Sequence, residues 1–277
     1  MSVNPIPARG LLGDTTARDY SEKLRRFNAF AAPELCRAIA SLGLKPGMRV
    51  LDAGCGTGEA LAWLGAEVGP TGTVVGMDLA LAHTVAASEA GNAVQADLLA
   101  PPFMGAAFAA IWSVNVINHL RSPLEGIRVL AALLRPGGCI ALGQSSFLPD
   151  MYFAWDARLE RVVNDAVRAF YRDKYAVDER ALAGVRANAG LLRAAGFREV
   201  QARTFAIDRI SPVRPDDERY IVETLFRDSW GSRLRPYMDA DDYELLMRLC
   251  DPADKAFALA RPDFHFLQTF TLVTATL

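Results

Sequence analysis

The chain has 277 residues, 51% of them apolar, and a formal net charge of −2. This length suits one large α/β domain with an appended subdomain. No run of Lys and Arg exceeds two residues. The sequence therefore offers no surface that would track phosphates, which argues against a nucleic-acid partner.

Targeting and cysteine patterns point to a cytoplasmic protein. The N-terminal residues contain no apolar signal-peptide core, and no apolar run approaches the ~18 residues that suggest a membrane span. Four cysteines are scattered without paired spacing: Cys36, Cys55, Cys139 and Cys250. We expect reduced thiols, with neither a disulfide nor a zinc site.

The N-terminal 45 residues predict an arm followed by two helices. Residues 1–14 hold two prolines and two glycines, and are expected to form a loose arm. One helix is predicted over residues 16–28. A second is expected to begin at Pro33, because proline is favourable at the first helical position, and to end at Gly43.

Residues 48–58 predict a strand, a tight glycine turn and the start of a helix. The apolar residues 48–51 lead into Asp52, and three glycines follow at alternate positions: Gly54, Gly56 and Gly58. Glycine allows positive φ and close approach of a ligand to the backbone. This is typical of the nucleotide-binding corner of a Rossmann-like sheet; the alternative is a glycine-rich turn without a ligand.

Two further strands also end in acids. Residues 73–77 lead into Asp78, which lies 78 − 54 = 24 residues after Gly54. That offset is close to the one expected for a carboxylate that accepts from ribose hydroxyls. Residues 93–96 lead into Asp97. The third glycine of a dinucleotide motif would fall at Glu59, so the spacing disfavours NAD.

The remaining pattern completes an alternation of strands and helices. Ser122-Pro123 opens a helix with a capping box and proline at its first position. A further helix is expected at residues 180–195. Strands are expected at residues 108–114, 139–144, 199–210 and 264–276.

Four motifs in this order resemble a class I S-adenosylmethionine (SAM) dependent methyltransferase. They are Asp52-Ala53-Gly54-Cys55-Gly56-Thr57-Gly58, Gly76-Met77-Asp78, Gln95-Ala96-Asp97-Leu98 and Leu134-Arg135-Pro136-Gly137-Gly138. The resemblance covers residues 45–145 and implies a Rossmann-like seven-stranded α/β sheet. Helices would cover both faces, and strand seven would run antiparallel between strands five and six.

The resemblance also implies which residues bind SAM and its product S-adenosylhomocysteine. Asp52 and the loop after it would hold the methionine end, Asp78 the ribose, and Asp97 with the Leu98 amide the adenine. Asn115 would flank the methionine moiety and the reaction centre. The implied set is Asp52, Gly54, Cys55, Gly56, Gly58, Asp78, Leu79, His83, Asp97, Leu98 and Asn115. For His83 and Cys55 we favour packing over chemistry.

The expected organisation adds two helical segments to the core. Residues 1–45 form the N-terminal arm and helices, and residues 46–210 the SAM-binding core, with a helical insertion at about 147–178. Residues 211–262, named here the lid segment, hold two amphipathic patterns, and residues 263–277 form the final strand. Long insertions often carry function, so the lid segment is expected above the sheet. Its aromatic residues, Trp230 among them, line either an apolar pocket or the lid segment's own core, and for most of them the second is favoured.

Two histidines are candidate general bases. His119 follows strand four in a segment similar to the family's substrate loop, although it could instead face solvent at a helix start. His265 begins strand seven, which we expect beside the carboxyl ends of the other strands. Imidazole can accept a proton near neutral pH, and a base is needed only for a protonated acceptor.

The motifs favour a small-molecule acceptor and no metal. No trio of acids marks a magnesium site, and the strand-four segment Ser113-Val114-Asn115-Val116 lacks the Asn/Asp-Pro-Pro-Tyr string of base and glutamine methyltransferases. O-, N- and C-methylation stay open, as does a monomer or homodimer. The alternatives are a SAM-binding cyclase and, disfavoured by charge and motif, a protein or RNA methyltransferase.

Overall fold

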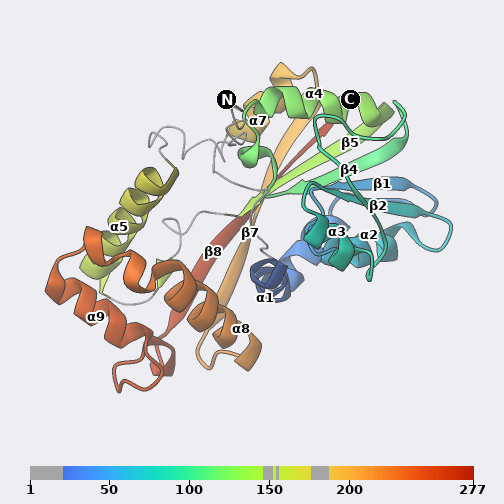
Figure 1. Cartoon of the computed structure of the whole chain (residues 1–277). Helices are drawn as coiled ribbons and strands as arrows, with labels where there is room; N and C mark the ends of the chain where they lie inside the picture. The colour runs from blue at the N-terminus through green and yellow to red at the C-terminus, as the bar shows by residue number, and fades with distance from the viewer. Residues whose placement is uncertain (1–20, 146–151, 154–155, 176–186) are drawn as a thin grey trace, which may run out of the picture.

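The computed structural model describes residues 21–145, 152–153, 156–175 and 187–277, and Figure 1 shows their arrangement around one twisted sheet. In these residues the sheet has eight strands in the order β3-β2-β1-β4-β5-β8, with β7 and the two-residue β6 both paired to β8. The strands are β1 Arg49–Ala53, β2 Thr73–Asp78, β3 Asn92–Gln95, β4 Phe108–Val114, β5 Leu134–Ser145, β6 Tyr152–Phe153, β7 Arg198–Ile210 and β8 His265–Thr276.

Strand β8 is the antiparallel strand that the sequence predicted. The pairs β1–β2, β1–β4, β2–β3 and β4–β5 are parallel, whereas β8 runs antiparallel to β5 and to β7. It therefore lies between the fifth and sixth long strands. The predicted fold class, a Rossmann-like mixed sheet, is confirmed.

Helices cover both faces of the sheet. One face packs against α4 Pro123–Leu133 and α7 Asn188–Ala194, where Ile127, Leu130 and Leu192 are fully buried. The other face packs against α1 Ser21–Ala40 and α2 Glu59–Val68. The remaining helical elements are α3 Leu81–Ala87, η1 Ile117–His119, α5 Ala157–Tyr175, α8 Pro215–Arg219, the π-helix η4 Tyr220–Trp230, η5 Gly231–Arg233, η6 Arg235–Tyr237, α9 Ala240–Cys250 and η7 Ala258–Ala260.

The N-terminal region corrects one prediction. A single helix, α1, runs through Pro33, where the sequence had predicted two helices. Proline removes one helical hydrogen bond, the one to the carbonyl of Ala29. Ala29 is exposed, so water can solvate that carbonyl, while Phe30 and Leu35 stay buried on one continuous face. Burial of that face outweighs the lost bond. The expected arm and residues 16–20 lie outside the described residues.

Two other boundaries differ from the prediction. Strand β5 begins at Leu134, five residues before the predicted Cys139, because Leu134 pairs with Phe108 ahead of a shift in register. Helix α7 begins at Asn188, while the expected start at residue 180 lies outside the described residues, as do parts of the insertion at 147–178.

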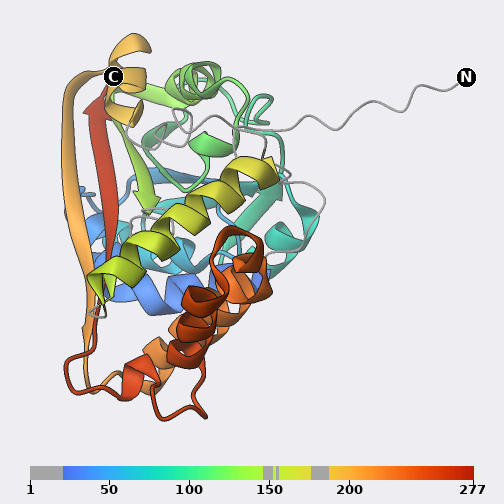
Figure 2. The same ribbon diagram turned by 90° about the vertical axis from the view of Figure 1, so that its left-hand side faces the viewer.

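Strands β7 and β8 extend past the rest of the sheet as a two-stranded ribbon. Strand β5 accompanies β8 only from Thr276 to Phe270, where its last residue, Ser145, ends the pairing. Strand β7 continues beside β8 to the pair Ile210 and His265. Figure 2 shows the two strands side by side, with the lid helices gathered at the ribbon's far end.

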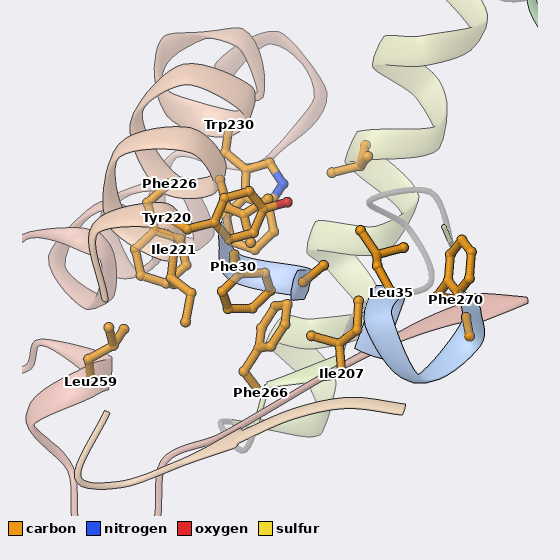
Figure 3. Close-up of a cluster of buried hydrophobic side chains, with 14 of the residues drawn as sticks. Phe30, Leu35, Ile207, Tyr220, Ile221, Phe226, Trp230, Leu259, Phe266 and Phe270 are labelled. Atoms are coloured by element: carbon orange, nitrogen blue, oxygen red, sulfur yellow. The ribbon is translucent and has the colours of Figure 1, made fainter. Parts of the chain in front are cut away.

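The lid segment is joined to the sheet by an aromatic cluster (Figure 3). Phe30 of α1 stacks on Tyr220 with ring centroids 4.2 Å apart and meets the edge of Phe266 of β8 at 5.6 Å. Phe226 and Trp230 stack at 5.4 Å. These rings are almost fully buried, so the lid helices share one core with α1 and β8. Within the described part of the chain, no helix has the length and apolar character needed to cross a bilayer.

Candidate active site

A cavity of about 460 Å³ opens where the parallel strands end. One side, named here the strand wall, comes from segments that follow β1 to β5: residues 52–56, 78–79, 96–98, 114–120 and 144–145. Further lining residues, named here the helix wall, come from α1, α5 and η4: Lys23, Leu24, Phe27, Asn28, Tyr171, Lys174, Tyr220, Thr224, Leu225 and Ser229. The volume suits an organic cofactor or substrate.

The glycine loop brings bare backbone to the strand wall. Gly54 and Gly56 have φ of 83° and 52°, in the left-handed region that favours glycine. A Cβ on Gly54 would lie 2.2 Å from Cγ2 of Val116, so the two segments approach as closely as only glycine permits. The loop thus leaves room along its backbone and none for a side chain at Gly54.

Gly58 has a different position from the one expected. It does not line the cavity, and with φ of 90° a Cβ there would lie 2.7 Å from Cα of Ala87. Its lack of a side chain therefore allows α2 to begin against the end of α3. Gly58 therefore has a packing role here, and its contact with the cofactor stays a prediction.

Asp52 is a buried carboxyl at the end of β1. Its side chain is 2% exposed, it lines the cavity, and Oδ2 has no hydrogen-bond partner among the described residues. Burial, together with the nearby charges of Asp78 and Glu59, raises its pKa to about 8. A cation bound in the cavity would offset that cost of ionisation.

Asp78, at the end of β2, has the opposite electrostatic setting. It accepts hydrogen bonds from the amides of Gly56 and Ala80, both at 2.9 Å, and lies 3.2 Å from Nδ1 of His83. Burial opposes its ionisation, but the bond to His83 and the two amide bonds outweigh burial and hold its pKa below the usual value. In the same cavity, the pKa of Asp52 is therefore raised and the pKa of Asp78 is lowered.

The rest of the strand wall is set by local turns. Asp97 accepts a hydrogen bond from the amide of Leu99 at 2.9 Å, which fixes the turn after β3. Asn115 has φ of 57°, and its Oδ1 accepts from the amide of Ser145 at 2.9 Å and from the Ser145 hydroxyl at 3.0 Å. The ends of β4 and β5 are thereby tied together.

The cavity collects nearly all the predicted site residues, although the structure alone assigns none of them a ligand. Those that line it are Asp52, Gly54, Cys55, Gly56, Asp78, Leu79, His83, Asp97, Leu98, Asn115 and His119. Cys55 is buried and fills space against Leu61, consistent with a packing role. His119 does not face open solvent: burial lowers its pKa, and Nδ1 is buried without a partner among the described residues.

The predicted location of His265 is wrong. It lies on the ribbon, half exposed, with Nε2 2.7 Å from Oδ1 of Asp208, and it does not line the cavity. Strand β8 passes the end of β5 at Phe270, five residues after His265. At ~3.4 Å per residue, this places His265 roughly 17 Å beyond the sheet edge. The prediction assumed that β8 begins level with that edge.

Sequence reasoning missed most of the helix wall. Lys23 and Phe27 lie four residues apart on α1, and Tyr171 and Lys174 lie three apart on α5, so each pair shares a helix face. That spacing is readable, but it does not tell which face meets the cavity. Trp230, singled out as a lid aromatic, packs in the aromatic cluster instead of lining the cavity.

Comparison with known proteins agrees with this fold. A family model described as a methyltransferase domain matches residues 26–202, so the chain belongs to the methyltransferase domain family. The resemblance to class I SAM-dependent methyltransferases predicted from the motifs is confirmed.

Relatives and solved structures resemble different portions of the chain. A ubiquinone biosynthesis O-methyltransferase of Xanthomonas campestris is 35% identical over 121 residues, which are 40% of this chain and 48% of that protein. A malonyl-[acyl-carrier protein] O-methyltransferase of Pseudescherichia vulneris is 31% identical over 43% of this chain and 48% of its own. The chain thus spans about half the length of the curated relatives it matches.

Among solved structures, the YcgJ protein of Bacillus subtilis matches with a TM-score of 0.53 and 16% identity, over 88% of this chain and 98% of its own. Phosphoethanolamine N-methyltransferase 2 of Haemonchus contortus, solved with S-adenosyl-L-methionine, matches with a TM-score of 0.53 and 15% identity, over 95% of this chain and 60% of its own. These likenesses support the fold.

Proposed function

We propose that this protein transfers a methyl group from SAM to a small-molecule acceptor, without a metal. The observation that carries the proposal is the strand wall, where Asp52, Asp78 and Asp97 surround a glycine loop at the carboxyl edge of the sheet. Ligands bind at that edge in open α/β sheets. Membership of the methyltransferase domain family supports the same reaction.

The residues of the strand wall fit SAM. The Asp52 carboxyl, with Oδ2 unpartnered among the described residues, would face the cationic methionine end beside the bare backbone of Gly54 and Gly56. Asp78, held ionised, would accept from ribose hydroxyls, and Asp97 would receive the adenine amino group beside the Leu98 amide. When bound, SAM supplies a methyl group already activated on a sulfonium.

The chain's own contribution is to orient the reactants, exclude water and hold a proton. The helix wall and the strand wall together enclose the cavity, and holding reactants in one orientation can supply much of a rate enhancement. His119 is the proposed base for a hydroxyl acceptor. Since burial keeps its imidazole neutral at pH 7, Nδ1 can accept a proton. The relatives named as O-methyltransferases favour an oxygen acceptor.

The lid segment has the proposed role of selecting the acceptor. Its helix η4 contributes Tyr220, Thr224, Leu225 and Ser229 to the helix wall. A π-helix is rare and is found often at functional sites. Changes in η4 should therefore alter acceptor affinity more than cofactor affinity.

Calorimetric titration tests the cofactor proposal. SAM and S-adenosylhomocysteine should bind, and NAD should not. Asp78→Asn should weaken S-adenosylhomocysteine binding by ~1–3 kcal/mol, because a charged acceptor is lost. The same change at the exposed Asp165 should have no effect. NAD affinity equal to that of SAM would refute the assignment. Comparison of metabolites in cells with and without the protein would then identify the methylated acceptor.

A further inference from the structure

We infer that the acceptor carries an anionic group, a carboxylate or a phosphate, which binds at the helix wall between Lys23 and Lys174 and within reach of the Thr224 hydroxyl. This inference rests on the proposed function. It names the substrate class for the half of the cavity that the cofactor residues do not form.

Lysines are concentrated at this cavity. The chain has four lysines among its 30 basic residues, and two of them line the helix wall. They come from α1 and α5, which are distant in sequence. Lys174 also lies 5.7 Å and 5.9 Å from the ring centroids of Phe170 and Tyr171. Lys174 therefore places a cationic group beside aromatic rings, a combination suited to an acidic organic molecule.

The positive charges of the helix wall act on one another. Lys23 is an exposed residue that lines the cavity. Desolvation, followed by the charges of Lys174 and Arg233, lowers its pKa, and the charge of Asp228 opposes the shift. Asp228 also faces Arg26 at 3.5 Å and Arg227 at 3.2 Å, so its charge is shared. An anion bound between the two lysines would favour their charged forms.

A buried hydroxyl supplies an independent observation. Thr224 is 1% exposed and lines the cavity, and its Oγ1 has no hydrogen-bond partner among the described residues. Its carbonyl is already bonded by the Ser229 hydroxyl at 2.7 Å. A buried hydroxyl without a partner costs free energy that a ligand oxygen could recover. Thr224 can donate to an anionic oxygen.

The two walls of the cavity carry acidic and basic side chains respectively. Asp52, Asp78 and Asp97 line the strand wall, and Lys23 and Lys174 line the helix wall. An acceptor with one anionic group would be repelled by the ionised Asp78 and attracted by the two lysines. Its neutral end, which carries the atom to be methylated, would then face the strand wall. The charge pattern thus orients the acceptor as well as binding it.

Three aromatic probes test the inference on protein saturated with S-adenosylhomocysteine. Benzoate, phenyl phosphate and benzamide have one ring and differ in charge, and their affinities follow from ligand-observed NMR titration. We expect the better of the two anions to bind about tenfold more tightly than benzamide, since charge attraction is its advantage. Comparison of benzoate with phenyl phosphate shows which anionic group the wall prefers.

Variants locate the preference. Lys23→Met and Lys174→Met should each reduce the preference for the anions over benzamide, and Lys→Arg at either position should retain that preference. Lys255→Met removes an exposed lysine elsewhere and should leave the preference unchanged. Equal affinity for anions and benzamide would overturn the inference, and so would a preference that survives both Met variants. A variant that weakens S-adenosylhomocysteine instead would assign the lysine to the cofactor. Failure of S-adenosylhomocysteine to bind at all would overturn the proposed function itself.

Discussion

The strand wall and the helix wall enclose one cavity but are built in different ways. The strand wall uses short segments that directly follow strands, and its contacts are largely made by backbone, as at Gly54 and at the amides that bond Asp78. The helix wall uses side chains from three helices that are far apart in sequence, such as Lys23, Lys174 and Thr224. One wall depends on local geometry, and the other on how helices pack.

The most damaging change to the strand wall should be at Gly54. Gly54→Val should abolish S-adenosylhomocysteine binding, because any Cβ there meets Val116 and φ is 83°. Titration of the folded variant measures the loss. Gly137→Val separates the two causes: φ there is 72°, but nothing lies within 4 Å, so binding should persist. Normal binding by Gly54→Val would contradict the proposed cofactor position.

The anchoring of the helix wall should be the next most sensitive feature. Arg209 of β7 is paired with Glu34 at 3.0 Å and with Asp217 at 3.2 Å, and it lies 4.7 Å from the Phe30 ring centroid. Arg209→Met would leave Glu34 and Asp217 with only their exposed partners, Arg37 and Arg214, and should cost ~2–3 kcal/mol of unfolding free energy. Urea denaturation measures this cost. Arg219→Met, at an exposed ion pair, should cost less than ~1 kcal/mol.

His119 should affect turnover more than stability. For an acceptor that must lose a proton, His119→Gln should lower kcat by ~10²-fold. Because burial lowers the pKa of His119, the neutral base persists as pH falls, and the acidic limb of the wild-type profile should lie below pH 6.5. His265→Gln is the matched control and should retain full turnover, since that residue lies on the ribbon. Identical profiles for His119→Gln and wild type would show that no base operates there.

Asp52 should give the smallest change and one that depends on pH. Its pKa is raised in the folded state from 3.8 to about 8, so ionisation destabilises the folded protein. Wild-type stability should fall as pH rises from about 4 to 8, and Asp52→Asn should remove that fall. Without ligand, the variant should be more stable by ~1–3 kcal/mol at pH 8, a part of the ionisation cost because Asn also buries a polar group. Denaturation at pH 5 and pH 8 measures the difference.

Asp52→Asn should also weaken the binding of the cofactor. A bound cation favours the ionised Asp52, so S-adenosylhomocysteine binding to wild type should release a proton below pH 8. Calorimetry in two buffers of different ionisation enthalpy detects that release, and Asp52→Asn should lack it. Equal proton release by both forms would show that Asp52 does not face the cation.

The contrast between the walls explains what the sequence could predict. Asp52, Asp78 and Asp97 each follow an apolar strand, and parallel strands end at one edge, so residues separated along the chain could be placed together. No comparable rule predicts from the sequence which helix residues meet at the helix wall. Which face of α1 meets the cavity depends on how Phe30 and Leu35 pack against the sheet. The error at His265 has the same origin, since the overhang of β8 is set by its partner β7 and by the lid that both carry.

The ribbon has a consequence for how such proteins diversify. Ile210 and His265 are paired, so the sheet fixes the two ends of the segment between them next to each other. A segment inserted between such fixed ends adds little loop-closure entropy when its length changes. The length of this segment can therefore vary at little entropic cost, provided that its aromatic residues still complete the core shared with Phe30 and Phe266.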